Sequence, residues 1–135
     1  MSIQFFLVHE DGSKADPFGT GNKFFLGNHQ TKGGVIRTCE DAEVTLGLSL
    51  AEGLETALSV ALISRQHCWS ALNAGNLSNL PHVSGIEEIT IHADNDKAGR
   101  AAAQTFTERM RGSGLIVGTV FPKAPYTDFN DWLCQ

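Results

Sequence analysis

From residue 44 onward, short apolar runs alternate with longer segments in which apolar residues recur every three or four positions. The runs predict strands at Val44–Ala51, Cys68–Leu72, Ile86–Ala93 and Leu115–Phe121. Strands that are joined through helices pair in parallel. The alternation therefore predicts an α/β fold with about four central parallel strands flanked by helices.

Two longer helices are predicted between these strands. The first covers residues 54–66, and the second covers Lys97–Arg111, where an apolar residue at every fourth position predicts one buried face. The residues of that face are Ala98, Ala102, Phe106 and Met110. Residues 73–76 are predicted to form a loop, and residues 79–81 a brief helical turn.

The first 43 residues differ in composition from the rest of the chain, because they are rich in glycine and other turn-forming residues. Short apolar runs at Ile3–Val8, Lys23–Leu26 and Val35–Arg37 predict the strands of an antiparallel β ribbon. We therefore divide the chain into an N-terminal β ribbon, residues 1–43, which we expect to pack on the main domain, and an α/β domain, residues 44–135.

The cysteine and histidine residues give no pattern of a disulfide framework or a zinc site. Cys39, Cys68 and Cys134 are odd in number and far apart, which favours a reduced, intracellular setting. The histidines without metal-ligand spacing are His9, His29, His67 and His82. Neither a signal peptide nor an apolar stretch of membrane length is found, so we expect a cytoplasmic protein without membrane partners.

The net charge of −5 limits how this chain can meet nucleic acid. Tight non-specific binding requires a broad basic surface that attracts phosphates. Contact with nucleic acid is therefore expected to be local and metal-assisted, or to depend on a partner.

Acidic residues follow two of the predicted strands. Glu52 comes directly after the first strand, and Asp94 and Asp96 come after the third. Ligands of open parallel sheets bind beyond the carboxyl ends of the strands, and carboxylate oxygens suit Mg²⁺. We predict that Asp94 and Asp96 hold Mg²⁺, with Mn²⁺ as the alternative ion, and that Glu52 acts as a further ligand or as an acid or base.

Neighbouring residues support this site. Gly53 and Gly99 lie at the starts of the two helices, where a missing side chain allows a sharp turn or a close approach. The amino ends of both helices would face an anionic substrate. Lys97 and Arg100 are candidate phosphate contacts, with simple solvent exposure as the alternative. His92 is interpreted as structural, since a histidine within a strand more often packs than reacts.

Four segments together resemble the Toprim domain of phage- and plasmid-type DNA primases. In chain order they read LAEGLETAL (50–58), ALNAGNL (71–77), ADNDKAGRAA (93–102) and DFNDWL (128–133). Taken singly, the acidic residues could serve only as helix caps or as charges at a helix start. Their joint occurrence in this order favours a metal site.

The resemblance implies a Toprim, Rossmann-like fold and assigns roles to particular residues. Glu52 is implied as the catalytic glutamate, and Asp94 and Asp96 as the metal-binding pair. Asp128 corresponds to a later acidic position of primase Toprim domains, although Thr127 stands where a lysine often precedes it.

The implied activity is Mg²⁺-dependent nucleotidyl transfer or phosphodiester chemistry on DNA, as in a primase-type catalytic module of replication. The implied partners are DNA, nucleoside triphosphates and other replication proteins such as a helicase. Two alternatives remain open at this point. One is a Toprim nuclease with the same carboxylates, and the other is a non-catalytic module that binds nucleic acid or protein.

Overall fold

The computed structural model describes residues 4–21, 23–25 and 30–134. The chain divides into two compact units, Met1–Lys32 and Gly33–Gln135. Each unit is described by itself.

The first unit contains two short strands, β1 (Gln4–Phe6) and β2 (Lys23–Phe25), which pair antiparallel. The ammonium group of Lys23 lies 5.8 Å from the centre of the Phe6 ring. Ile3 and Leu26, which the sequence also assigned to these strands, lie outside the described residues.

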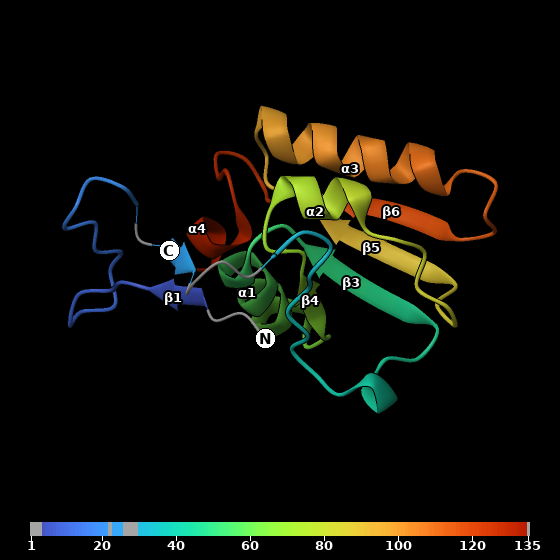
Figure 1. The fold of residues 1–135 in the computed structure, drawn as a ribbon, viewed down its shortest axis with the longest axis horizontal. Helices are drawn as coiled ribbons and strands as arrows, with labels where there is room; N and C mark the ends of the chain where they lie inside the picture. The colour runs from blue at the N-terminus through green and yellow to red at the C-terminus, as the bar shows by residue number, and fades with distance from the viewer. Residues whose placement is uncertain (1–3, 22, 26–29, 135) are drawn as a thin grey trace. The chain divides into compact units, whose positions relative to one another are not determined.

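The second unit is built on a four-stranded parallel sheet with the strand order β4-β3-β5-β6 (Figure 1). The strands are β3 (Gly47–Ala51), β4 (Cys68–Ser70), β5 (Glu88–His92) and β6 (Ile116–Val120). All three neighbouring pairs are parallel. The predicted α/β fold with four central parallel strands is confirmed.

The third predicted ribbon segment, Val35–Arg37, does not pair with β1 or β2 among the described residues. Ile36 instead forms an isolated antiparallel bridge with Ser70 at the outer edge of β4. The apolar run at this place therefore serves the edge of the parallel sheet, and the prediction of a three-segment ribbon is wrong at this position.

The described residues contain four α-helices and one 3₁₀ helix, of which the last α-helix follows the last strand and the others lie between strands. The α-helices are α1 (Leu54–Ser64), α2 (Ala74–Asn79), α3 (Lys97–Met110) and α4 (Phe129–Leu133), and the 3₁₀ helix is η1 (Asp41–Glu43). The helices predicted on either side of the central strands correspond to α1 and α3. Among the described residues, no helix is both long and apolar enough to cross a membrane.

The loop predicted at residues 73–76 is instead the start of α2. The side chain of Asn73 accepts a hydrogen bond of 2.9 Å from the backbone N–H of Asn76, which caps the helix. Leu77 is fully buried and anchors the helix in the core. The polar run was therefore a capping signal, and the turn predicted at residues 79–81 is the place where α2 ends.

One face of the sheet is covered by α2 and α3, which lie side by side (Figure 1). Leu50 and Ile91 point to this face and are fully buried together with Phe106 of α3 and Leu77 of α2. Because side chains alternate along a strand, the neighbours of these strand residues face the other way.

The opposite face packs against α1 and α4. Ala51 and Cys68 of the sheet form a smaller apolar cluster with Ala57 and Val60 of α1 and Phe129 of α4. The helix α1 thus rests on small residues, whereas its larger Leu58 and Leu62 are 49% and 71% exposed.

The predicted core face of α3 is mostly confirmed. Ala102, Phe106 and Met110 are buried, but Ala98 is exposed. The first turn of α3 starts directly after the loop that follows β5, and there Gly99 takes the buried position in place of Ala98.

Phe106 gives a direct test of this core. Replacing it with alanine should lower the free energy of unfolding by about 3–5 kcal/mol, because the substitution removes a fully buried aromatic ring and leaves a cavity. Leu62→Ala, at an exposed position of α1, should change it by less than about 0.5 kcal/mol. Urea denaturation measures both values, and equal losses in the two variants would contradict the described core.

Candidate active site

The sheet has a topological switch point between β3 and β5. From β3 the chain moves outward to β4 through α1, whereas from β5 it moves outward in the other direction to β6 through α3. The two connecting helices cover opposite faces of the sheet. In such sheets a crevice opens between the two central strands at their carboxyl ends, and ligands bind there.

The acidic residues leave the sheet at this switch point. Ala51, the last residue of β3, pairs with His92, the last residue of β5. Glu52 follows Ala51 directly, and Asp94 follows His92 after a single residue. The two carboxylates therefore start from adjacent strands at the same edge of the sheet. This placement allows them to share one site.

Asp94 lies at the centre of a crowded group of carboxylates. Its pKa is raised from 3.8 to about 6, first because burial disfavours the charged form and then because Glu52, Asp128 and Asp96 repel its charge. The hydroxyl of Thr56 donates a hydrogen bond of 3.3 Å to Asp94, which acts in the opposite direction. Glu52 and Asp128, which are distant in the sequence, thus interact with one half-buried acid together with its neighbour Asp96.

Asp96 begins α3 and is more exposed than Asp94. Its carboxylate accepts a hydrogen bond of 2.7 Å from the backbone N–H of Gly99, so it caps the helix. This bond fixes the carboxylate at the amino end of α3, where unpaired N–H groups favour negative charge. Capping and metal binding are compatible, because a carboxylate has two oxygens.

The sequence suggested that Gly99 leaves open space for the close approach of a ligand. The structure shows no such space. A Cβ atom at this position would lie 2.5 Å from the carbonyl oxygen of Asp94 and 3.0 Å from its backbone nitrogen. The space is therefore filled by the backbone of Asp94 itself. Gly53 needs no special conformation either, since its φ of −104° is open to any residue.

Asp128 is held next to the loop after β5 by backbone contacts. The N–H of Asn95 donates a hydrogen bond of 2.6 Å to the carbonyl oxygen of Thr127. Asp128 caps α4, because its carboxylate accepts a hydrogen bond of 2.7 Å from the backbone N–H of Asp131. These bonds place a carboxylate that is distant in the sequence close enough to raise the pKa of Asp94.

The two candidate phosphate contacts differ in how firmly they are held. Arg100 donates a short hydrogen bond to the side chain of Asn95, and its guanidinium group lies 4.3 Å from the centre of the Phe121 ring. Lys97 is exposed at the first position of α3. Arg100 is thus fixed beside the acidic loop, whereas Lys97 faces solvent.

His92 packs behind the site. Its ring meets Phe129 edge to face, with 5.3 Å between the ring centres, and its Nε2 lies 3.3 Å from the hydroxyl of Ser49. Burial lowers the pKa of His92, which favours the neutral ring. These contacts agree with the structural role predicted from the sequence.

Thr56 and Thr127 are two residues of the site that the sequence reasoning did not assign. Thr56 lies in the first turn of α1 and reaches the carboxylate of Asp94. Thr127 contributes its backbone carbonyl to the loop after β5. The position of Thr56, one helical turn after Glu52, is a signal that points to the crevice, whereas a backbone contact leaves no signal in the sequence.

The fold and the acidic cluster together define a Rossmann-like α/β domain with a carboxylate site at its switch point. The chain belongs to the Toprim domain family, which matches residues 47–135. The predicted resemblance is thereby confirmed.

Primase domains of known structure share this fold. A DNA primase domain from Pseudomonas aeruginosa has a TM-score of 0.60 at 13% identity, covering 98% of this chain and 46% of that chain. The DnaG primase catalytic domain bound to ssDNA has a TM-score of 0.64 at 15% identity, and the match covers 98% of this chain and 48% of that chain. The primase fragment of the bacteriophage T7 primase-helicase protein has a TM-score of 0.55 at 17% identity, and the match covers 96% of this chain and 56% of that chain.

This chain spans about half the length of those primase chains. At such identities the likeness concerns the fold. No curated protein sequence gives a significant match.

Replacing Gly99 with alanine should disturb the acidic loop, because the new methyl group would meet the backbone of Asp94. We expect a loss of about 1–3 kcal/mol in the free energy of unfolding, as for other overpacked positions. Gly118→Ala is the matched control, because its Cβ would meet no atom closer than 4.0 Å. A Gly99→Ala protein as stable as the Gly118→Ala protein would contradict this packing.

The raised pKa of Asp94 predicts an unusual pH dependence in metal-free protein. Between about pH 4 and pH 6 the folded protein keeps a proton that the unfolded chain has lost, so stability falls as the pH rises. Asp94→Asn should therefore be more stable than wild type at pH 8, and the difference should vanish near pH 4. Comparing the two proteins separates Asp94 from other titrating groups.

Thermal unfolding in the presence of a chelator measures this difference. Glu87→Gln, an exposed substitution at the other end of β5, serves as the control and should show no such gain. If Asp94→Asn is less stable than wild type at pH 8, the carboxylates do not repel one another as described.

Proposed function

We propose that this chain is a catalytic module for Mg²⁺-dependent nucleotidyl transfer on DNA, of the primase type. Asp94 and Asp96 hold the ion, Glu52 acts as a further ligand or as the acid or base, and Asp128 assists. The observation that carries this proposal is the convergence of Glu52, Asp96 and Asp128 on Asp94, whose pKa is raised to about 6 by burial first and then by the charges of these carboxylates.

Such crowding is costly for the protein unless a cation shares the site. Like charges in a partly buried place destabilise one another, and a divalent ion would remove that repulsion. The donors are all carboxylate oxygens, which match Mg²⁺ and Mn²⁺ better than softer metals. Toprim domains generally bind divalent metals, in keeping with this donor set.

The residues of the site have different parts in the proposed reaction. Mg²⁺ would neutralise charge on the phosphate groups of the substrates. Asp96 is fixed by its bond to Gly99, and Asp94 by Thr56, so the two carboxylates keep their places as substrate enters. Glu52, which follows β3 at the same edge of the sheet as Asp94, would take a proton from the attacking hydroxyl.

Substrate binding is proposed to rely on few cationic contacts. Arg100 is held beside the acidic loop and would contact a phosphate, with Lys97 next to it at the start of α3. The net charge of −5 gives little general attraction for DNA. Further replication domains or proteins, of which a helicase is one candidate, would supply the remaining affinity.

The metal assignment is tested by calorimetric titration with Mg²⁺ and Mn²⁺. Wild type should bind the ion, and the Asp94→Asn/Asp96→Asn double variant should lose binding because two of its ligands are neutral amides. Glu87→Gln should bind as wild type does. Equal binding by wild type and the double variant would refute the assignment.

The catalytic assignment is tested with a single-stranded DNA template, nucleoside triphosphates and Mg²⁺. Glu52→Gln should lower nucleotide incorporation by about 10²–10⁴-fold, the usual contribution of a general acid or base. Labelled DNA incubated with Mg²⁺ but without nucleotides should stay intact. Cleavage that depends on Glu52 would indicate a Toprim nuclease, and the absence of both activities would indicate an interaction module.

A further inference from the structure

Three side chains with metal-binding groups meet at the end of the sheet opposite to the acidic cluster. They are Cys39, Glu43 at the end of η1, and His67 directly before β4. Both η1 and His67 come before strands, β3 and β4, that are parallel neighbours. Segments that enter neighbouring parallel strands lie at the same edge, so residues far apart in the sequence converge there.

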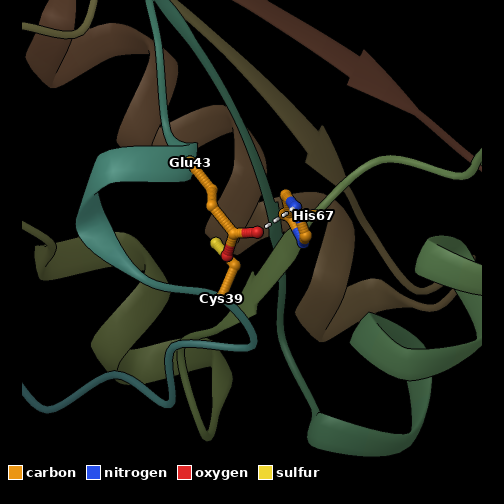
Figure 2. A group of neighbouring side chains, drawn as sticks. All are labelled: Cys39, Glu43 and His67. Atoms are coloured by element: carbon orange, nitrogen blue, oxygen red, sulfur yellow. Dashed lines mark ion pairs between the residues drawn. The ribbon is translucent and has the colours of Figure 1, made fainter.

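The three side chains point toward one another (Figure 2). One ligand atom from each residue, the sulfur, a carboxylate oxygen and a ring nitrogen, lies within 4.8 Å of the others. Oε1 of Glu43 is 3.9 Å from Nε2 of His67. This group could not be predicted from the sequence, because Cys39 and His67 belong to no recognisable metal-binding spacing.

We propose that Cys39, Glu43 and His67 bind one Zn²⁺ ion, with water as the fourth ligand. Thiolate, imidazole and carboxylate are the ligand types of zinc. Tetrahedral zinc with bonds of about 2.0–2.3 Å places its ligand atoms about 3.3–3.8 Å apart. The side chain of His67 is about half exposed, so its rotation would bring Nε2 closer to Oε1 of Glu43.

The surroundings of the group orient its ligands. The indole N–H of Trp69 donates a hydrogen bond of 3.4 Å to the sulfur of Cys39, an outer contact that stabilises a thiolate. Oε2 of Glu43 accepts a hydrogen bond of 2.9 Å from the backbone N–H of Glu40. This bond turns Oε1 toward His67. Two of the three ligands are thus held in place by neighbours.

One of the nearby cations is already paired. The guanidinium group of Arg37 lies 5.1 Å from the centre of the Trp69 ring, but it forms an ion pair of 2.7 Å with Asp41. A cavity of about 410 Å³ opens beside Glu43 and His67, with Arg65 also in its wall. This cavity gives an ion access and leaves room for a water ligand.

An exposed ion pair between Glu43 and His67 is the simpler explanation of their contact. At 3.9 Å, with both side chains about half exposed, such a pair contributes little to stability. It also leaves the approach of the Cys39 thiol to both side chains unexplained. Soft sulfur and nitrogen donors select zinc over magnesium, so the group differs in chemistry from the acidic cluster.

Zinc at this place would connect the segment that enters β3 to the start of β4. A ligand that binds only the folded protein raises stability in proportion to the logarithm of its concentration. The proposal is independent of the proposed catalytic function, because the two groups lie at opposite ends of the parallel strands.

The test uses the full chain with Zn²⁺ in calorimetry and with Co²⁺ as a spectroscopic probe. We expect one equivalent of Zn²⁺ to bind and Co²⁺ to give the near-ultraviolet charge-transfer absorption of a cobalt–thiolate bond. Cys39→Ser should abolish that absorption and weaken Zn²⁺ binding more than about 100-fold, because loss of an outer contact alone costs about 10–100-fold. Cys134→Ser, which removes another exposed thiol, should leave both unchanged.

Two further variants keep the result interpretable. His67→Ala, at an exposed position, should weaken Zn²⁺ binding even if the serine variant at position 39 folds poorly. Asp94→Asn/Asp96→Asn should retain the cobalt–thiolate absorption, because the acidic cluster contains no sulfur. The proposal is overturned if wild type shows no such absorption, or if the absorption depends on Cys134 rather than on Cys39.

Discussion

The parallel pairing of β3 with β5 is the interaction on which the site depends. Its register sets Ala51 opposite His92, and both strands then end at the same edge of the sheet. The helices that follow leave toward opposite faces, so Glu52 and Asp94 remain partly exposed between them. Glu52 and Asp94 are close together for this reason, and no contact between their side chains is required to bring them there.

The loop after β5 is positioned by backbone packing as much as by side chains. Gly99 allows the first turn of α3 to lie directly against the backbone of Asp94, and the N–H of Asn95 binds the carbonyl group of Thr127. These contacts hold carboxylates near one another although their charges repel. A cluster of this kind stores electrostatic repulsion that a divalent cation would relieve.

Periodicity and strand-end position were enough to predict the parallel sheet, α1, α3 and the convergence of Glu52 and Asp94. Prediction from the sequence failed where a polar residue caps a helix. Asn73 caps α2, although residues 73–76 were predicted to form a loop. Prediction also failed where contacts join distant segments. Nothing in the spacing of Cys39 and His67 shows that the amino ends of β3 and β4 bring them together.

We propose that Asp94 is a half-buried acid, crowded by other carboxylates, at a site that binds a divalent cation. The most direct measurement is an NMR titration of the Asp94 side-chain carboxyl carbon, without and with Mg²⁺. We predict a pKa of about 6 in the metal-free protein, which falls when Mg²⁺ is added. A midpoint near the ordinary value of 3.8 that does not respond to Mg²⁺ would contradict the account.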